Sequence, residues 1–236
     1  MIKRFFALLL VASFGFILFT AFANWQPQTE LRGVARDYVQ READELGAMN
    51  VVTAIVVVYR GLDTLGEVTV LFLAASGIAV LMRRRKNITI KSKRREASEF
   101  LQTGGALLAP PLIMLGATIF LNGHLSPGGG FQGGAVIASA VLLLFMARPG
   151  YRPNHTLLDW IESISGFAYV TVGILGMFLA GGFLDSRILP LGEFGKMLSA
   201  GAIPVIYTFI GLKVGTELSG ILDSLKNESL LTINDK

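Results

Sequence analysis

The residues of this chain that could move protons or ions are a few ionisable side chains within or beside long apolar stretches. Asp63 and Glu67 are four residues apart, so both carboxylates would share one face of a helix, and Arg60 precedes them. Glu67 lies inside an apolar run, where loss of water favours the neutral acid and allows it to load and release a proton. Helix capping by Asp63 and a dipole interaction of Glu67 are the simpler alternatives.

A second group of ionisable residues lies further along the chain. Glu162 follows Asp159 by one helical turn and lies deeper in its apolar stretch. Lys213 and Glu217 form an i,i+4 pair, whose simplest interpretation is a surface ion pair with a lysine that snorkels at the end of a span. His124 can titrate near neutral pH or serve as a hydrogen-bonding residue. Because ionisable groups in a span tend to mark ion paths, the predicted ion-path candidates are Arg60, Asp63, Glu67, His124, Glu162, Lys213 and Glu217.

A glycine-rich segment at residues 123–134 separates two strongly apolar runs. Such a turn lets backbone pack against backbone and can present peptide groups to water or an ion. It is not a phosphate-binding loop, since the Gly-Lys-Ser/Thr end and the preceding strand are missing. The predicted structural loop consists of Pro127, Gly128, Gly129, Gly130, Phe131, Gly133 and Gly134. Glycines within the spans, Gly104 among them, are expected at helix–helix contacts.

The composition excludes several classes of protein. Mean hydropathy is +0.58, and only 16% of residues are charged, against about 25% in soluble domains. The absence of cysteine excludes disulfides, thiolate metal sites and iron–sulfur clusters within this chain. No Ser-His-Asp or His-Glu-x-x-His pattern is present, so we expect no catalytic residues, metal or cofactor. The net charge of +4 does not indicate nucleic-acid binding, because the basic residues gather in one linker and at helix ends.

Several apolar runs are near 20 residues long, the length needed to cross about 30 Å of hydrocarbon. We therefore predict an all-α, multi-pass protein of the cell membrane, with spans at about residues 5–22, 64–82, 100–121, 133–146, 158–183 and 196–213. Most of the 21 lysines and arginines then fall on one side, including the cluster at residues 83–95. The positive-inside rule places that side, and both termini, in the cytoplasm.

Two segments leave the count open to alternatives. Residues 51–59 are apolar but too short for a separate crossing, which would also reverse the downstream topology, so we expect a re-entrant or interfacial piece near residues 50–60. Its β-branched residues mean that it need not be helical. The N-terminal run resembles a signal peptide ending at residues 21–23, but about 18 apolar residues exceed a usual signal core and favour a retained anchor.

Three features occur together in residues 99–220: the glycine-rich loop with Gly123-His124, Glu162 at the start of the next helix, and the segment Gly211-Leu212-Lys213-Val214-Gly215. With them the sequence closely resembles the B subunit of Mrp-type (Mnh) multisubunit sodium/proton antiporters. Gln132 stands where that family is expected to have an apolar residue.

Two earlier segments, residues 50–53 and 59–67, resemble the C-terminal part of the antiporter A subunit. In membrane-bound hydrogenases and related archaeal respiratory complexes that part is a separate E subunit. The expected organisation is an A- or E-like membrane segment at residues 1–82, a basic cytoplasmic linker at 83–98, a four-helix B-like domain at 99–220 and a cytoplasmic tail at 221–236.

The resemblance implies an accessory subunit of a Na⁺/H⁺ antiporter module, a transport component and not an enzyme. It implies A-, C-, D-, E-, F- and G-like membrane partners, in a stand-alone antiporter or in a hydrogenase- or sulfur-reductase-like complex with an iron–sulfur redox arm. It implies an ion-path role near the A-subunit interface for Asp63 and Glu67, and a loop-shaping role for Pro127 and Phe131. A purely structural scaffold is the alternative; an independent transporter would show inverted repeats, and we find no convincing ones.

Overall fold

The computed structural model describes residues 2–23, 25, 30–83 and 97–232. Within these ranges the chain forms helices, turns and loops, without a β-strand. Six of the helices are long and apolar enough to cross a membrane, which confirms the predicted all-α class with six spans. Most of the predicted basic linker and the last residues of the predicted tail lie outside the described residues, and the side the termini face stays a prediction.

The chain falls into two units, residues 1–37 and 38–236. The first contains α1 (Ile2–Ala23) and the start of α2 (Val34–Glu45). Helix α1 is apolar on all sides, and nearly all of its described side chains are exposed. Its Ser13 and Thr20 hydroxyls donate to carbonyls one turn earlier, each at 2.9 Å, so these polar groups are satisfied within the helix. Such a helix suits a lipid or protein environment and not water.

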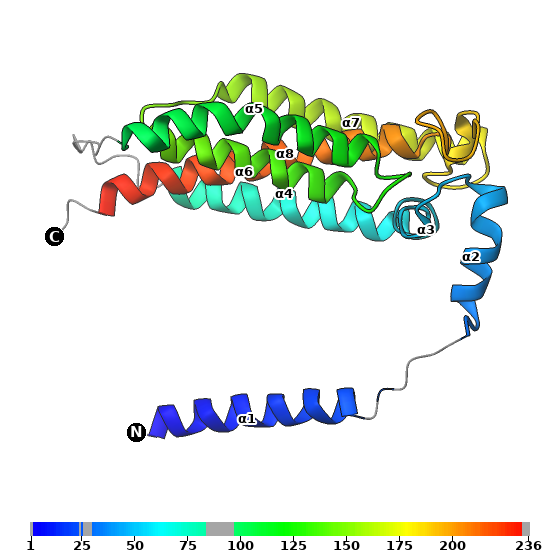
Figure 1. Ribbon diagram of the computed structural model, residues 1–236, viewed down its shortest axis with the longest axis horizontal. Coiled ribbons are helices and arrows are strands. Elements are labelled where there is room, and N and C mark those ends of the chain that lie inside the picture. Colours follow the sequence, from blue (N-terminus) through cyan, green and yellow to red (C-terminus); the bar gives the residue numbers. More distant parts are fainter. Residues whose placement is uncertain (1, 24, 26–29, 84–96, 233–236) are drawn as a thin grey trace. The chain divides into compact units, whose positions relative to one another are not determined.

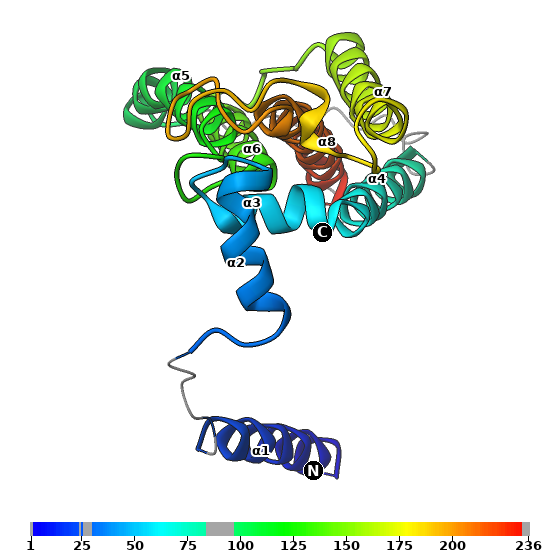
Figure 2. The same ribbon diagram turned by 90° about the vertical axis from the view of Figure 1, so that its right-hand side faces the viewer.

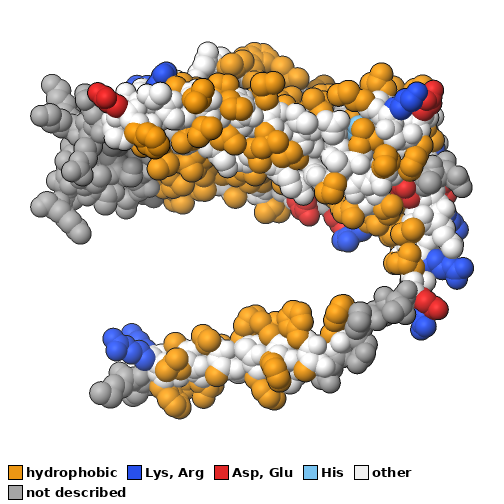
Figure 3. All heavy atoms as spheres, viewed as in Figure 1, with side chains coloured by type: hydrophobic (Ala, Val, Ile, Leu, Met, Phe, Trp, Pro, Cys, Tyr) orange, Lys and Arg blue, Asp and Glu red, His pale blue; other side chains and the backbone are white. Residues whose placement is uncertain are grey.

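The second unit is built around its last helix. Five long helices form the bundle: α4 (Gly61–Arg83), α5 (Glu99–Leu121), α6 (Gly130–Ala147), α7 (His155–Leu179) and α8 (Ile203–Thr232). Helix α8 lies in the middle and contacts the four others, with α5 and α6 on one side and α4 and α7 on the other (Figures 1 and 2). Hydrophobic side chains cover much of the outer surface of the bundle (Figure 3), as expected for a lipid-facing protein.

The described connections between these helices gather at two ends of the bundle (Figure 1). We call one the loop end, formed by residues 46–60, 122–129 and 180–202. We call the other the basic end, formed by residues 148–154 and the C-terminal part of α8, which carry Arg148, Arg152 and Lys226. Sequence analysis predicts that the basic end faces the cytoplasm.

The predicted last span is wrong in its position. Residues 197–202 are apolar or small but belong to a loop, and α8 runs from Ile203 to Thr232. Residues 200 and 201 have positive φ angles of 62° and 59°, and the Ala200 N–H donates to the Leu191 carbonyl at 2.8 Å. A helix cannot include this turn. Lys213 therefore lies about 15 Å into α8, at 1.5 Å per residue, and not at its end. The other predicted spans agree with the helices within a few residues.

The short apolar segment before α4 is helical and does not form a separate span. It consists of α3 (Val51–Ala54), followed by a π-helical turn, η1 (Ile55–Tyr59). Asn50 caps α3 by accepting from the Thr53 N–H. Thr53, Ala54 and Val57 are buried against the bundle, so the segment is anchored by side chains despite its β-branched composition. The Thr64 hydroxyl donates to the Val56 carbonyl at 2.7 Å and ties η1 to the first turn of α4.

Helices α5, α6 and α8 meet through glycine backbones. A Cβ atom on Gly134 of α6 would lie 2.8 Å from the carbonyl oxygen of Gly211 in α8. A Cβ on Gly116 of α5 would lie 2.7 Å from the carbonyl oxygen of Gly133. In lipid, where the hydrophobic effect supplies little drive between helices, such close approach is a main source of association. The expectation that Gly104 makes the same kind of contact is wrong, because nothing lies within 4 Å of its Cβ position.

These two situations allow a matched test. Gly134→Ala should destabilise the bundle by about 1–3 kcal/mol, because the methyl group overlaps the α8 backbone. Gly104→Ala should be neutral or slightly stabilising, since it gains helix propensity without a clash. Thermal unfolding of the purified protein in detergent measures both. Equal midpoints for the two variants would contradict the close-packed interface.

Candidate functional site

A buried charge cluster lies midway along the bundle. The Lys213 ammonium donates to Glu217 Oε1 at 2.5 Å, and Glu162 Oε1 of α7 lies 3.7 Å from the same nitrogen. The side chain of Glu217 is fully buried and that of Lys213 is only 11% exposed. The interpretation of Lys213 and Glu217 as a surface pair is therefore wrong. The pair looked terminal because the last span was predicted too early in the sequence.

The neighbouring helices shape the space around Lys213. Its spacing from Glu217 places both on one face of α8, and Glu162 faces them from α7. A Cβ on Gly166, one turn after Glu162, would lie 3.4 to 3.6 Å from the end of the lysine side chain, so the glycine leaves room for that stem. Phe72 of α4 places its ring 4.9 Å from the ammonium, close enough for a cation–π interaction. Three helices thus surround one charge.

The cluster has one carboxylate more than it has ammonium groups. Glu217 Oε2 is buried and has no hydrogen-bond partner among the described residues. A buried, half-satisfied carboxylate is costly unless a proton, a water molecule or a cation reaches it. With all three residues ionised, the site therefore carries a net negative charge and can take up one positive charge.

A cavity of about 170 Å³ adjoins the cluster and has room for a few water molecules at about 30 Å³ each. Helices α4, α7 and α8 line it, mostly with apolar side chains, together with Thr69, Tyr169 and Lys213. The Tyr169 hydroxyl lies 3.4 Å from the Gly61 carbonyl that accepts its hydrogen bond. Glu67 lies close enough to Tyr169 to act on it electrostatically. The cavity therefore lies between the level of Glu67 and that of Lys213.

The remaining candidates, Arg60 just before α4 and Asp63 and Glu67 on α4, are exposed. Arg60 Nε donates to Asp63 Oδ2 at 2.7 Å, so this arginine pairs with Asp63. Glu67 is exposed on α4, outside the buried cluster. The ion-path role of these three residues stays a prediction.

The glycine-rich loop binds the segment that precedes α4. Asn50 Nδ2 donates to the carbonyl oxygens of Gly123 and Ser126, each at 2.9 Å. The Thr53 hydroxyl donates to the Gly123 carbonyl at 2.6 Å and accepts from the Tyr207 hydroxyl at 3.2 Å. The loop thus presents its peptide groups to side chains of this protein. In the sequence, residues 50–53 are notable only for their resemblance to the antiporter A subunit. No local motif predicts a hydrogen bond from a side chain to a carbonyl oxygen far along the chain.

Glycine is required at several positions of this loop because α8 packs closely against the loop backbone. A Cβ on Gly123 would lie 2.7 Å from the Tyr207 ring, and one on Gly130 would lie 2.5 Å from Ile210. Gly128 has φ +155°, a conformation that side chains rarely adopt. Pro127 is exposed, whereas Phe131 is half-buried and packs against the core. The loop is therefore a packing element at the loop end, and the loop-shaping role expected of Pro127 and Phe131 stays a prediction.

His124 is completely buried in this loop. Neither of its ring nitrogens makes a hydrogen bond of good geometry to the described residues. Burial lowers the pKa of the imidazole, and the nearby backbone groups of Lys196, Met197 and Leu121 oppose this in part. Its own carbonyl accepts from the Asn50 N–H at 3.0 Å. His124 belongs to the loop end and is not part of the Lys213 cluster.

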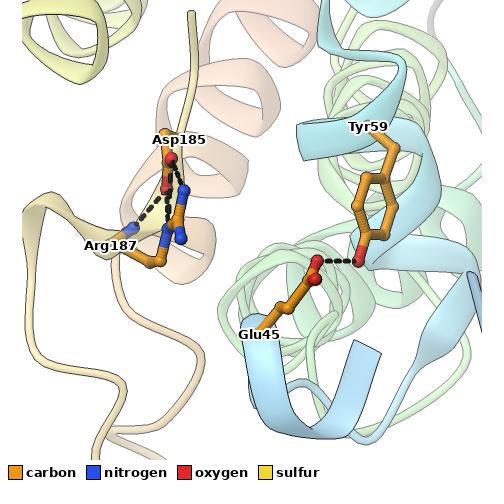
Figure 4. A network of polar contacts seen from close by, with 4 residues as sticks. All are labelled: Glu45, Tyr59, Asp185 and Arg187. Atoms are coloured by element: carbon orange, nitrogen blue, oxygen red, sulfur yellow. Dashed lines mark hydrogen bonds and ion pairs between the residues drawn. The ribbon is translucent and has the colours of Figure 1, made fainter. Parts of the chain in front are cut away.

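Two further polar contacts occupy the loop end (Figure 4). Arg187 Nη2 lies 2.5 Å from Asp185 Oδ2, and hydrogen bonds from this guanidinium hold the pKa of Asp185 below its usual value. The Tyr59 hydroxyl donates to Glu45 Oε2 at 3.0 Å, and burial together with this carboxylate raises the pKa of Tyr59 to about 12. The sequence alone does not single out either of these pairs. No group of three His, Cys, Asp or Glu residues that could hold a metal occurs among the described residues.

A bundle of apolar helices around a buried carboxylate–ammonium–carboxylate cluster defines a multi-pass membrane protein. The chain belongs to the family of domains related to the MnhB subunit of the Na⁺/H⁺ antiporter, whose model matches residues 100–220. Residues 3–95 match a second family, described as the E subunit of MBH.

Two solved structures contain chains that are similar to this one. A chain in the structure of the membrane-bound sulfane sulfur reductase, an archaeal respiratory membrane complex, is 42% identical, with a TM-score of 0.80 over 95% of this chain and 98% of that one. The Mrp complex from Dietzia sp. DQ12-45-1b shares the fold, with a TM-score of 0.76 and 22% identity over 94% of this chain and 26% of that one.

A protein of Rhizobium meliloti (strain 1021), named as a probable A/B subunit of a K(+)/H(+) antiporter, is 29% identical over 246 residues. The match covers 91% of this chain and 24% of that protein, so the chain spans about a quarter of its length.

The buried Lys213–Glu217 pair should contribute more to the free energy of unfolding than an exposed pair, which a double-mutant cycle can measure. Lys213→Met keeps the apolar stem but leaves Glu217 buried without its partner, which should cost about 3–5 kcal/mol of unfolding free energy. Adding Glu217→Gln to Lys213→Met should recover part of that loss. The exposed pair Lys196–Glu193 provides the control, and its Met and Gln variants should change stability by less than about 1 kcal/mol. Similar costs at the two pairs would mean that the Lys213 pair is solvated.

His124 predicts a pH-dependent stability. Because the folded chain favours the neutral imidazole, its contribution is complete above the ordinary histidine pKa of 6.5 and is lost as the pH falls below that value. The thermal unfolding midpoint should therefore fall between about pH 7.5 and pH 5.5, across the usual titration range of histidine. His124→Gln should reduce that fall. An unchanged pH slope in the variant would show that other groups cause it.

Proposed function

We propose that this chain is an accessory membrane component of a multisubunit cation/proton antiporter module and that Glu162, Lys213 and Glu217 form its ion-path site. The buried cluster, with one carboxylate more than it has ammonium groups, carries the proposal. A site of this kind is costly in a membrane interior, and such sites tend to serve ion or proton movement.

The cluster can change its charge without a large rearrangement. A proton that binds the unpartnered oxygen of Glu217 would weaken the attraction between that carboxyl group and Lys213. The ammonium could then turn toward Glu162, which is only 3.7 Å away. Loss of the proton would reverse the shift. Water in the adjoining cavity would connect the cluster toward Glu67, which we place at the interface with a neighbouring protein of the complex or a hydrated region.

The relatives favour a respiratory setting. The 42% identity to a chain of the sulfane sulfur reductase complex covers nearly the whole length of both chains, which supports a redox-driven complex over a stand-alone Mrp antiporter. The partners would then be A-, C-, D-, E-, F- and G-like membrane proteins and a peripheral arm with iron–sulfur proteins. The relatives' names include both Na⁺ and K⁺, so the transported cation is decided by experiment. We place the complex in the cell membrane, with the basic end in the cytoplasm.

Transport by the reconstituted complex tests this function. The native complex that contains this chain, sealed into liposomes with a trapped pH dye, should move protons when Na⁺ or K⁺ is added. Glu162→Gln and Glu217→Gln should each lower that rate roughly a hundredfold, the lower range for one positioned acid–base group, without lowering the yield of complex. Glu193→Gln, at an exposed loop residue, should behave like the wild type.

A purely structural role of the cluster predicts a different result. If Glu162→Gln and Glu217→Gln lower the yield of complex and the transport rate per complex stays at the wild-type value, the cluster serves assembly. Wild-type transport with wild-type yield would also reject the proposed site.

A further inference from the structure

The basic end contains an acid–base pair that joins the same two helices as the Lys213 cluster. His155, the first residue of α7, places Nε2 3.4 Å from Oδ2 of Asp223 in α8. The two side chains differ sharply in environment, since that of His155 is 61% exposed and that of Asp223 only 7%. The exposed imidazole of His155 thus contacts the buried carboxylate of Asp223. Asn154 fixes the start of α7 by accepting from the Leu157 N–H at 3.2 Å.

The spacing on α7 links this pair to the buried cluster. His155, Asp159 and Glu162 follow at i, i+4 and i+7, and Gly166 and Tyr169 continue the same stripe at i+11 and i+14. Residues at these intervals lie on one face of a helix. The stripe therefore runs from the exposed histidine to the cavity beside Lys213. Asp159 is exposed between the two pairs and lies close enough to Glu162 to act on it electrostatically.

Charged groups from three segments lie around His155: α7 itself, α8, and the connection between α6 and α7. On its own helix the nearest is Asp159, and on α8 they are Asp223 and Lys226. Lys226 donates to the Tyr151 carbonyl at 2.8 Å and lies over a ring of α6 at 4.3 Å. The connection between α6 and α7 contributes Arg148 and Arg152, both exposed.

We propose that His155, paired with Asp223, is the group through which the Glu162–Lys213–Glu217 cluster exchanges protons with water at the basic end. The proposal rests on the proposed ion-path function. Histidine is suited to this step because it gains and loses a proton in the physiological pH range. A proton taken from water by His155 passes by way of Asp159, or water beside it, to Glu162, and the return path releases it. Asp223 acts as a positioning residue that orients the imidazole.

Chemical rescue separates this role from a structural latch between α7 and α8. The native complex is reconstituted as above, with His155→Ala, Thr156→Ala as the exposed neighbouring control, and Glu217→Gln. The probe is an imidazole that carries a sulfonate group and therefore does not cross the bilayer. His155→Ala should lower proton movement roughly tenfold or more, and the probe should restore it from one face of the liposome only. Thr156→Ala should match the wild type with or without the probe.

The possible outcomes are distinct. If Glu217→Gln is slow but His155→Ala runs at the wild-type rate, the inference is wrong and the proposed function stands. Slow transport by His155→Ala that the probe does not restore would also overturn it, in favour of a latch. Wild-type transport by Glu217→Gln, whatever His155→Ala does, would reject the proposed function instead. Rescue of His155→Ala together with impaired Glu217→Gln supports both.

Discussion

A lysine held between two glutamates in the membrane interior is the interaction on which the rest of the bundle depends. The ammonium group has to find partners there, because the hydrocarbon cannot solvate it. Glu217 supplies one from the same helix and Glu162 supplies the other from α7. These contacts require α7 and α8 to lie side by side in one register, and the ring of Phe72 brings α4 against the same point. Groups from three helices thus meet at a single charge.

The opposite side of α8 follows a different rule. There the backbones of α5, α6 and α8 approach one another through glycines, which gives van der Waals contact without polar groups. The two sides therefore differ in packing: glycines bring the helix backbones into contact in one half, whereas the charged half adjoins a cavity with room for water. The proposed shift of the Lys213 ammonium between Glu217 and Glu162 would take place in this less closely packed half.

Hydropathy and charge predicted the number of spans, because length and apolar content are properties of each segment alone. The sequence places Lys213 at the end of a span because residues 197–202 are apolar or small. Their backbone forms a turn, and composition does not report φ angles. The sequence also named Glu162, Lys213 and Glu217 separately. Their contact depends on how α7 meets α8, and no local pattern contains that. Likewise, no local pattern pairs His155 with Asp223, because the two residues lie on different helices.

The hydrogen bonds from Asn50 and Thr53 to the glycine-rich loop bear on how the two regions of the chain can be connected. Both side chains donate to main-chain carbonyl oxygens of the loop. The contact therefore depends on the backbone shape of the loop and not on the loop's side chains. Hydrogen bonds of this kind can form between two separate polypeptides or within one. The region similar to the E subunit of MBH and the MnhB-related region can therefore be joined or divided by gene fusion and fission without redesign of the surface where they meet.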